Sequence, residues 1–404
     1  MRQPVPWLIT GMAFIAFISL GLPDAILGVA FPSIRAEFDL PAAAIGVILF
    51  SSSVGYFLSS TFAGTIMRVL SLGWLLAIST GLVAVGLTGY SLAPFFPWFM
   101  LLAFGIGAGS GAVDTGLNAY AAERWTAARM NWLHGFFGIG AMIGPLVMTA
   151  VLTSGADWQI GYRLVGVVIV VMAVAFVLTR GLWADPASTP GDVPPAAVSL
   201  GHVLSHRAVL VQAAVFVTYC AVEVSAGQWA YTILRERFEA SEGMAGVWVG
   251  LYWGALAAGR LLFGSFAERL GPARLVRWSL VATLAGTVAF LVPAYGVAVA
   301  GLLVTGLGLA AVFPTLITLT SRRLPAPFVT HAIGISIGAA VLGGASFPTI
   351  GGALEGVAGP TAIAVLIAVT AGGCLVLNEL LDRMLGGGTL GRTGQAPAAA
   401  AVAD

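Results

Sequence analysis

Six ionisable residues lie inside long apolar stretches of the sequence, and they are the residues best suited to chemistry. They are Asp24, Asp114, His134, Glu223, Arg260 and Glu379. A charged side chain at the centre of a membrane helix costs at least about 2.5 kcal/mol, so each needs a partner or a function. Burial disfavours the charged form of a carboxylate, which lets it take up and release a proton. We predict that Asp24, Asp114 and Glu223 are proton-coupling residues.

The surroundings of the first two acids favour a polar site at mid-depth. Asp24 follows Pro23, which lacks a backbone donor, so we expect its helix to be broken or bent there. Asp114 and Asn118 are four residues apart and share a helix face, so both can point into one cavity. Asn118 is therefore a candidate ligand for a solute.

Other polar and aromatic residues could complete a solute site. Gln228 and Trp229 supply an amide and an indole, a pairing suited to sugars, whose hydroxyls hydrogen-bond in plane and whose C–H faces stack on rings. His134 could relay protons or bond to a helix end, and Tyr252 could line the cavity. These four join Asn118 as predicted substrate-binding residues.

The remaining intramembrane charges suggest structural roles. Arg260 precedes Glu268 by two helical turns, and we predict that these two residues and Arg269 form a gate. Glu379 lies four residues before Arg383, a spacing typical of an ion pair on one helix face.

The elements that position these residues are apolar stretches long enough to cross a bilayer. A helix rises 1.5 Å per residue and needs about 20 residues to cross about 30 Å of hydrocarbon. The stretches are residues 7–31, 41–67, 72–93, 95–121, 130–153, 161–183, 206–234, 243–267, 273–293, 296–320, 328–354 and 360–384. They predict twelve transmembrane helices.

The second half of the chain repeats the first at an offset of about 200 residues. Gly46, Gly64, Gly138 and Gly144 recur as Gly246, Gly264, Gly338 and Gly344, and Arg35 and Phe38 recur as Arg235 and Phe238. Glu223 falls one residue from the repeat counterpart of Asp24, so both halves place an acid at a similar depth. Two parallel copies of a six-helix unit with a binding site between them are typical of carriers.

The repeat defines the domains. We predict an N-terminal six-helix bundle over residues 1–183, a proline-containing cytoplasmic linker over 184–205, a C-terminal six-helix bundle over 206–385 and a disordered cytoplasmic tail over 386–404. The fold class is thus an all-α membrane protein of two pseudo-symmetric six-helix bundles.

Composition agrees with this class and excludes others. The 404 residues are 59% hydrophobic and 9% charged, with a mean hydropathy of +0.97, so the chain has too little polar surface for a soluble globule. A net charge of +1 does not favour a nucleic-acid partner. We find no nucleotide cradle, metal-binding histidine pair or nucleophile elbow, so we expect no enzyme activity and no cofactor.

The arginines predict the orientation. With the N-terminus in the cytoplasm, thirteen arginines are cytoplasmic and four are external, while Arg260 is intramembrane. Because cytoplasmic loops are enriched in positive charge, we expect both termini in the cytoplasm.

The loop after the eighth predicted helix resembles a family signature. Residues 264–274, Gly-Ser-Phe-Ala-Glu-Arg-Leu-Gly-Pro-Ala-Arg, resemble the G-x-x-x-[DE]-R-x-G-x-x-[RK] motif of the major facilitator superfamily. The first-half copy at 64–73 is degraded and lacks the acid. The resemblance covers essentially the whole chain and implies the major facilitator fold.

A narrower resemblance lies in predicted helices four, five and seven. The glycine-rich run 105–118, the run 133–145 and the run 223–229 are similar to the fucose–galactose–glucose:proton symporter branch and related bacterial sugar permeases. That resemblance implies that Asp24 and Asp114 are the proton and sugar sites, with Asn118 as a sugar contact.

Together these features predict a proton-coupled symporter of a sugar or similar small polar solute. We expect it to be a monomer in the bacterial inner membrane. Gly140-x-x-x-Gly144-Pro145 also overlaps a signature of drug:proton antiporters, so a proton-coupled exporter is one alternative, and a non-transporting membrane receptor is another. Sodium stays open as the coupling ion.

Overall fold

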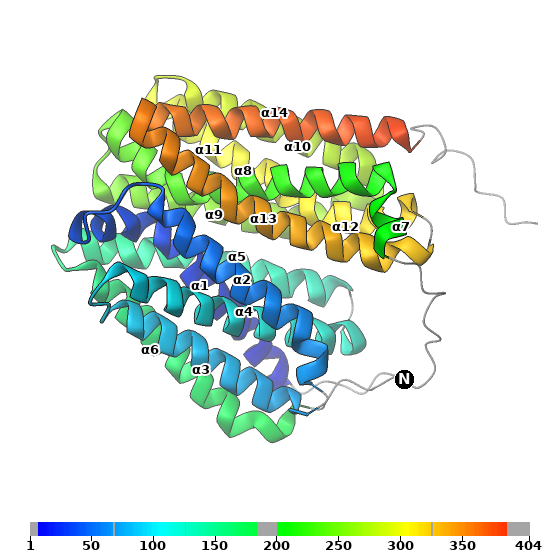
Figure 1. Ribbon diagram of the computed structural model, residues 1–404, viewed down its shortest axis with the longest axis horizontal. Helices are drawn as coiled ribbons and strands as arrows, with labels where there is room; N and C mark the ends of the chain where they lie inside the picture. The colour runs from blue at the N-terminus through cyan, green and yellow to red at the C-terminus, as the bar shows by residue number, and fades with distance from the viewer. Residues whose placement is uncertain (1–6, 68, 126, 184–199, 325, 386–404) are drawn as a thin grey trace, which may run out of the picture.

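The chain folds into long helices arranged as two bundles (Figure 1). The computed structural model describes residues 7–67, 69–125, 127–183, 200–324 and 326–385. The N-terminal bundle contains α1 (Trp7–Glu37), α2 (Ala44–Ile66), α3 (Leu72–Tyr90), α4 (Phe96–Arg124), α5 (Ala127–Thr153), α6 (Trp158–Thr179) and the 3-10 turn η1 (Arg180–Leu182). The C-terminal bundle contains α7 (Leu200–Leu204), α8 (Arg207–Phe238), α9 (Glu242–Leu270), α10 (Pro272–Leu291), α11 (Tyr295–Ala310), α12 (Val312–Arg323), α13 (Ala326–Ala358) and α14 (Pro360–Met384).

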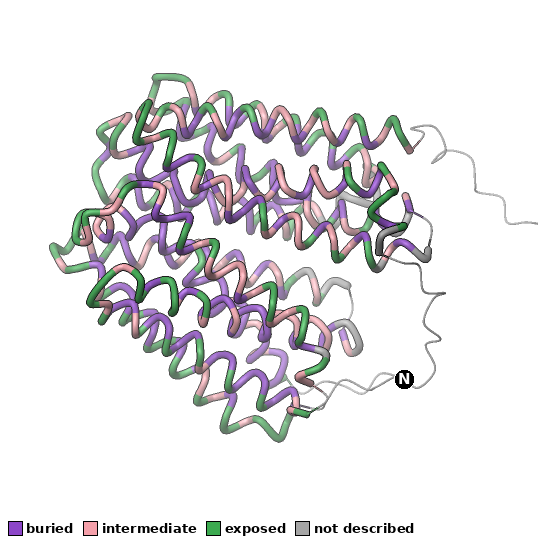
Figure 2. The backbone as a smooth tube through the Cα atoms, viewed as in Figure 1, coloured by how far each residue is buried: buried purple, intermediate pink, exposed green. Residues whose placement is uncertain are grey.

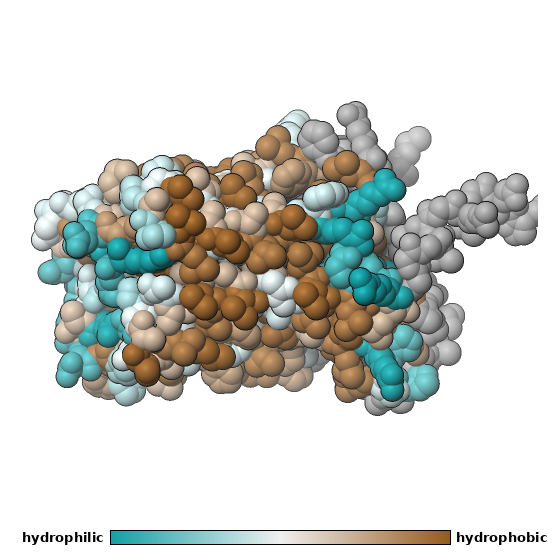
Figure 3. All heavy atoms as spheres, turned by 90° about the horizontal axis from the view of Figure 1, so that it is seen from above, coloured by the Kyte–Doolittle hydropathy of each residue, from teal (hydrophilic) through white to brown (hydrophobic). Residues whose placement is uncertain are grey.

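The twelve predicted spans are confirmed within the described residues, where twelve segments are long and apolar enough to cross a membrane. Figure 3 shows hydrophobic residues across the middle of one face and hydrophilic residues toward both ends. Large apolar side chains such as Val85, Val171 and Val369 are exposed on this exterior, while buried residues concentrate where helices face one another (Figure 2). The bilayer can solvate such a surface, whereas water cannot.

Pro23 and Pro314 have different effects on the helices that contain them. The expected break at Pro23 is not seen, because α1 runs without interruption from Trp7 to Glu37. A proline frees only one backbone carbonyl, and the buried neighbours Leu22, Ala25 and Ile26 hold the helix on both sides. In contrast, the tenth span is divided into α11 and α12 at Ala311, where Pro314 removes a backbone donor one turn later.

Repeat-related glycines join the two bundles. A Cβ at Gly46 of α2 would lie 1.6 Å from Thr349 Oγ1 of α13, and a Cβ at Gly246 of α9 would lie 1.7 Å from Thr149 Oγ1 of α5. Both members of each pair are 200 residues from their counterparts, so the two contacts are related by the repeat. Only glycine permits so close an approach.

These contacts lie at one end of the molecule, which we call the sealed end. It carries the connections 37–44, 153–158, 238–242 and 358–360, whereas α7 and the last turn of α14 lie at the opposite, terminal end (Figure 1). About three turns toward the terminal end, a Cβ at Gly138 would still lie 2.5 Å from Ala257, but one at Gly338 would lie 3.7 Å from Phe57. The α2–α13 seam is therefore looser there than the α5–α9 seam.

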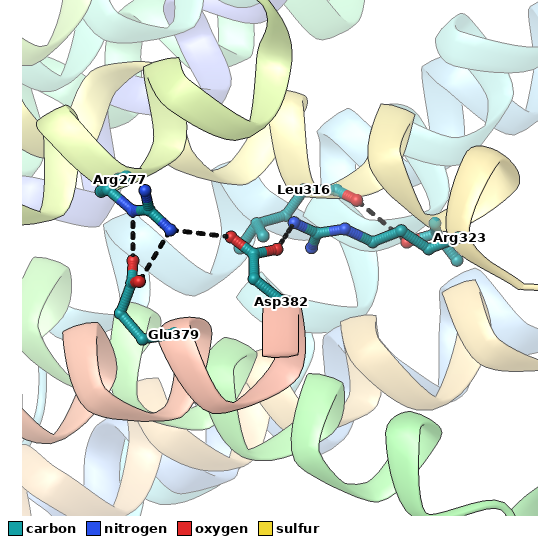
Figure 4. Close-up of polar contacts among 6 residues, drawn as sticks. Arg277, Leu316, Arg323, Glu379 and Asp382 are labelled. Carbon is teal, nitrogen blue, oxygen red and sulfur yellow. Dashed lines mark hydrogen bonds and ion pairs between the residues drawn. The ribbon is translucent and has the colours of Figure 1, made fainter. Parts of the chain in front are cut away.

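A charge cluster ties three C-terminal helices together at the terminal end (Figure 4). Arg277 of α10 donates to both carboxylate oxygens of Glu379 on α14, at 2.6 and 2.7 Å, and Arg323, the last residue of α12, pairs with Asp382 of α14. The predicted pairing of Glu379 with Arg383 is wrong, since Arg277 from the neighbouring helix reaches that carboxylate with a bidentate geometry that an arginine prefers.

Parts of the predicted domain scheme lie outside the described residues, namely 184–199 of the linker and the tail 386–404. The end of the predicted linker forms the short helix α7. Its Val203 is buried in a cluster with Val209 of α8 and Phe328 of α13, so this segment belongs to the packed C-terminal bundle.

We predict that Gly46→Val destabilises the protein, because the added side chain meets Thr349 and cannot be accommodated without moving a helix. Overpacking of this kind costs about 1–3 kcal/mol. The midpoint of thermal unfolding in detergent should fall well below that of Gly373→Val, a matched change in α14 where a Cβ meets nothing within 4 Å. Equal midpoints for the two variants would contradict a tight seam.

Candidate functional site

Asp24 lies at the middle of α1 and is exposed although its neighbours are buried. Leu22, Pro23, Ala25 and Ile26 are all buried, and α1 packs against both α5 and α8. Because α1 packs against a helix of each bundle, we infer that the accessible surface of Asp24 faces a space at the seam between the bundles. No described side chain bonds to it. Asp24 is thus the least compensated of the three predicted coupling acids.

Asp114 of α4 is held by two neutral donors. Tyr56 of α2 donates its hydroxyl to Oδ2 at 2.7 Å, and Asn118 donates its amide to Oδ1 at 3.0 Å. The predicted shared face of Asp114 and Asn118 is therefore confirmed. Asp114 also lies within electrostatic range of Asp24, so the N-terminal bundle brings two carboxylates to the same space.

Glu223 of α8 is compensated in a different way. Arg260 of α9 lies 3.3 Å from its Oε1, both side chains are largely buried, and Tyr219 donates a hydrogen bond to Oε2. Tyr252 donates its hydroxyl to the Glu223 backbone carbonyl at 2.8 Å. The C-terminal bundle therefore presents an ion pair with no net charge, in contrast to the two unpaired carboxylates of the other bundle.

Gln228, Trp229 and Tyr252 are buried, so their predicted contact with a solute stays a prediction. Gln228 is 3% exposed and donates its amide to the backbone carbonyl of Asp24 at 2.9 Å. Trp229 donates its indole N–H to the Pro348 carbonyl at 3.1 Å and packs edge-on against Phe31 of α1. Both residues thus bridge α8 to other helices at the seam.

His134 of α5 lies beside Phe17 of α1, with ring centroids 5.4 Å apart, and within electrostatic range of Arg260. The side chains of Glu268 and Arg269, the other predicted gate residues, lie outside the described part of the chain. Arg260 is paired with Glu223, so the structure brings together two residues that the sequence assigned to separate groups.

A second ion pair closes the sealed end, and the sequence analysis missed it. Arg35 at the end of α1 lies 3.1 Å from Glu355 of α13, which joins the two bundles. Its repeat counterpart Arg235 pairs instead with Glu242 of its own bundle at 3.5 Å. Both arginines also donate to a carbonyl five residues on. In the sequence, the recurrence of the two arginines in the repeat indicated their importance but did not identify the acids with which they pair.

Two adjoining cavities open at the sealed end, of about 340 and 530 Å³. They share Pro32, Ala36, Thr232 and Glu236 between α1 and α8. The close approach of Gly28 to Gln228, where a Cβ would lie 2.7 Å from the Gln228 carbonyl, lies between them and Asp24 along α1. These cavities are therefore separate from Asp24, Asp114 and Glu223.

Tyr56, Tyr219 and Glu355 are further site residues that were not assigned in advance. Tyr219 precedes Glu223 by one helical turn, a spacing that could have indicated the contact. Tyr56 and Glu355 reach their partners from distant helices. Among the described residues no group of three or more histidine, cysteine or acidic side chains could hold a metal ion.

This arrangement can bind a polar solute and one positive charge. Two carboxylates close together repel each other, so a proton or another cation stabilises the pair. The surrounding hydroxyl, amide and guanidinium groups offer hydrogen bonds to a solute at the same depth.

Comparison with known proteins agrees with this architecture. A family model described as Major Facilitator Superfamily matches residues 13–230 and 213–384. The chain is 22% identical over 345 residues to the glucose/mannose transporter GlcP of Bacillus subtilis, covering 83% of this chain and 84% of the relative. It is 24% identical over 310 residues to the mouse (Mus musculus) sodium-dependent glucose transporter 1A, covering 67% and 72%.

Solved structures share the fold. The nucleoside transporter NupG superposes with a TM-score of 0.73 at 15% identity, covering 94% of this chain and 98% of that one. The E. coli fucose:proton symporter FucP superposes with a TM-score of 0.64 at 16% identity, covering 94% and 99%.

We predict that Arg260→Leu and Glu223→Leu each destabilise the protein by about 3–5 kcal/mol, since each leaves a buried charge without its partner. The double variant should recover most of the loss. Thermal unfolding of the four proteins in detergent measures the coupling. Additive losses would show that the two residues are not an energetic pair.

We predict that Glu355→Gln opens the sealed end. Losing a partly exposed ion pair of about 1 kcal/mol shifts the ratio of open to closed forms about fivefold. Spin labels at Ser154→Cys and Val357→Cys, in a Cys220→Ala and Cys374→Ala background, report the distance between bundles. Glu242→Gln breaks the repeat-related pair with Arg235, which lies inside one bundle, and should leave that distance distribution unchanged. An identical response from both variants would show that the Arg35–Glu355 pair does not hold the bundles together.

Proposed function

The chain belongs to the Major Facilitator Superfamily, and we propose that it carries a sugar or similar small polar solute in symport with a proton. The members of this family are membrane carriers, so the chain is a multi-pass membrane transporter and not an enzyme. Its structural neighbours include transporters of sugars and of nucleosides. The solute and the coupling ion are the proposed parts.

One observation carries the proposal: the carboxylate of Asp24 is exposed, has no described side-chain partner and lies within electrostatic range of Asp114, which accepts from Tyr56 and Asn118. A carboxylate without a fixed partner can exchange its proton with water. The amide and hydroxyl groups around Asp114 can hydrogen-bond to sugar hydroxyls. A sugar also agrees with the relative GlcP, which is named a glucose/mannose transporter. We assign coupling to Asp24 and Asp114 and solute contact to Asn118.

Glu223 contributes differently in this scheme. Its ion pair with Arg260 lets both groups lie in the bundle without a net charge, and either group can hydrogen-bond a solute when the pair rearranges. Gln228, Trp229, His134 and Tyr252 then line or support the solute site from α5, α8 and α9.

Transport follows from rocking of the bundles about the seam. In this structure the sealed end is held by the two glycine–threonine contacts and by Arg35–Glu355. We assign the sealed end to the external side, because the arginine-rich connections belong to the other face. The structure is then the inward-facing state of a carrier in the bacterial cytoplasmic membrane, and a proton with a bound solute would relieve the charge penalty that opposes reorientation.

The motif that suggested drug export has a packing explanation. A Cβ at Gly140 would lie 2.1 Å from the Ile18 carbonyl, and one at Gly144 would lie 2.3 Å from the Leu22 carbonyl. These glycines let α5 pack closely on α1, so they do not by themselves favour export. A transport assay in proteoliposomes would detect drug efflux.

We predict that proteoliposomes accumulate a labelled sugar under an inward proton gradient and that Asp114→Asn abolishes this accumulation. The neutral amide cannot bind or release the coupling proton, so the internal and external concentrations should only equalise, while exchange of labelled for unlabelled sugar continues. A panel of hexoses, pentoses, polyols and nucleosides identifies the solute. Accumulation that follows a sodium gradient instead would reassign the ion, and efflux of drugs with no sugar uptake would overturn the proposal.

A further inference from the structure

We propose that Asp24 recognises a cationic amino group, so that this carrier takes protonated amino sugars, with the ammonium group occupying the place of the coupling proton. This inference rests on the proposed function and specifies the charge of its substrates. It depends on which charges face the space between the bundles and on which of them already have partners.

Among the described residues, no cationic side chain pairs with Asp24 or Asp114. Asp24 has no described side-chain partner, and its main charged neighbour is a second carboxylate, Asp114. The partners of Asp114 are the neutral Tyr56 and Asn118. An anionic solute, such as a sugar phosphate or a sugar acid, would add a further negative charge and be repelled.

Two described arginines of the neighbouring helices already have carboxylate partners. Arg260 is paired with Glu223 at 3.3 Å, and Arg35 lies beyond the Gly28–Gln228 contact, paired with Glu355 at 3.1 Å. Neither can neutralise Asp24 without leaving a buried carboxylate unpaired. A proton or a positive charge on the ligand can then balance Asp24.

A buried amide next to Asp24 supplies an independent indication of the ligand. Gln228 is 3% exposed, its amide nitrogen donates to the Asp24 carbonyl, and its Oε1 has no hydrogen-bond partner. The seam therefore holds two acceptors without a described donor, this amide oxygen and the Asp24 carboxylate. An ammonium group has three donors and no acceptor, which matches such a surface better than a hydroxyl group does.

A transport consequence follows. A neutral sugar needs a proton to neutralise the site before the bundles reorient, whereas an amino sugar brings its own positive charge. Uptake of the amino sugar should therefore be driven by the membrane potential without co-transport of a proton, whereas uptake of the neutral sugar should carry a proton with it.

The test compares glucose with glucosamine, and galactose with galactosamine, which differ by one hydroxyl against one ammonium group. Dissociation constants are measured on purified protein at a pH where the amine is protonated. We expect the wild type to bind the amino sugar at least about tenfold more tightly than its neutral analogue. Asp24→Asn should reduce this ratio about tenfold, whereas Asp157→Asn, the same change in an exposed loop, should leave it unchanged.

Proteoliposomes with a potassium diffusion potential and no pH gradient supply the second measurement. The potential drives both substrates, because a co-transported proton also carries positive charge. Accumulation of glucosamine without proton entry, and of glucose with proton entry reported by a pH dye inside the vesicles, supports the inference. Proton-coupled uptake of neutral sugars with a binding ratio that does not respond to Asp24→Asn would overturn this inference alone. Failure to move any sugar, neutral or cationic, would overturn both it and the proposed function.

Discussion

The cost of holding carboxylates between two lipid-facing bundles is the constraint on which the rest of the structure depends. For each of the three central acids this cost is offset in a different way. Asp114 accepts two hydrogen bonds from neutral groups, Glu223 pairs with Arg260, and Asp24 keeps contact with water. Only the last arrangement leaves a charge free to change with a ligand or a proton. The reactive part of the molecule is therefore the acid that the protein compensates least.

The repeat explains how such a space can exist inside a packed protein. Helices α2 and α9 each present a glycine to a threonine of the opposite bundle, which seals one end by contact of backbone with side chain. Further along, the α5–α9 seam stays tight while the α2–α13 seam loosens. Symmetric contacts at one end with unequal seams further along can let the bundles separate toward the terminal end without disturbing the packing within either bundle.

The two halves share a scaffold and differ in chemistry. Gly111 of the continuous helix α4 corresponds to Ala311, where the equivalent span is divided into α11 and α12. Asp114 corresponds to Pro314, so the second half has no counterpart of this acid. The arginines Arg35 and Arg235 bond to equivalent carbonyls, yet only Arg35 crosses to the other bundle. The N-terminal half thus supplies two carboxylates without a described cationic partner and the arginine that pairs with Glu355 of the other bundle. The C-terminal half supplies the Glu223–Arg260 ion pair, which has no net charge.

The sequence by itself determined the twelve spans, the two-bundle fold and the shared face of Asp114 and Asn118, because hydropathy, the 200-residue repeat and an i, i+4 spacing are all properties of the linear chain. It also predicted which acids lie within the spans. Only the tertiary structure decided the partners. Arg260 and Glu223 are 37 residues apart, Arg277 and Glu379 are 102 apart, and Arg35 and Glu355 are 320 apart. No local pattern specifies such pairs, since which arginine reaches which carboxylate depends on how the helices pack and on how closely their glycines let them approach.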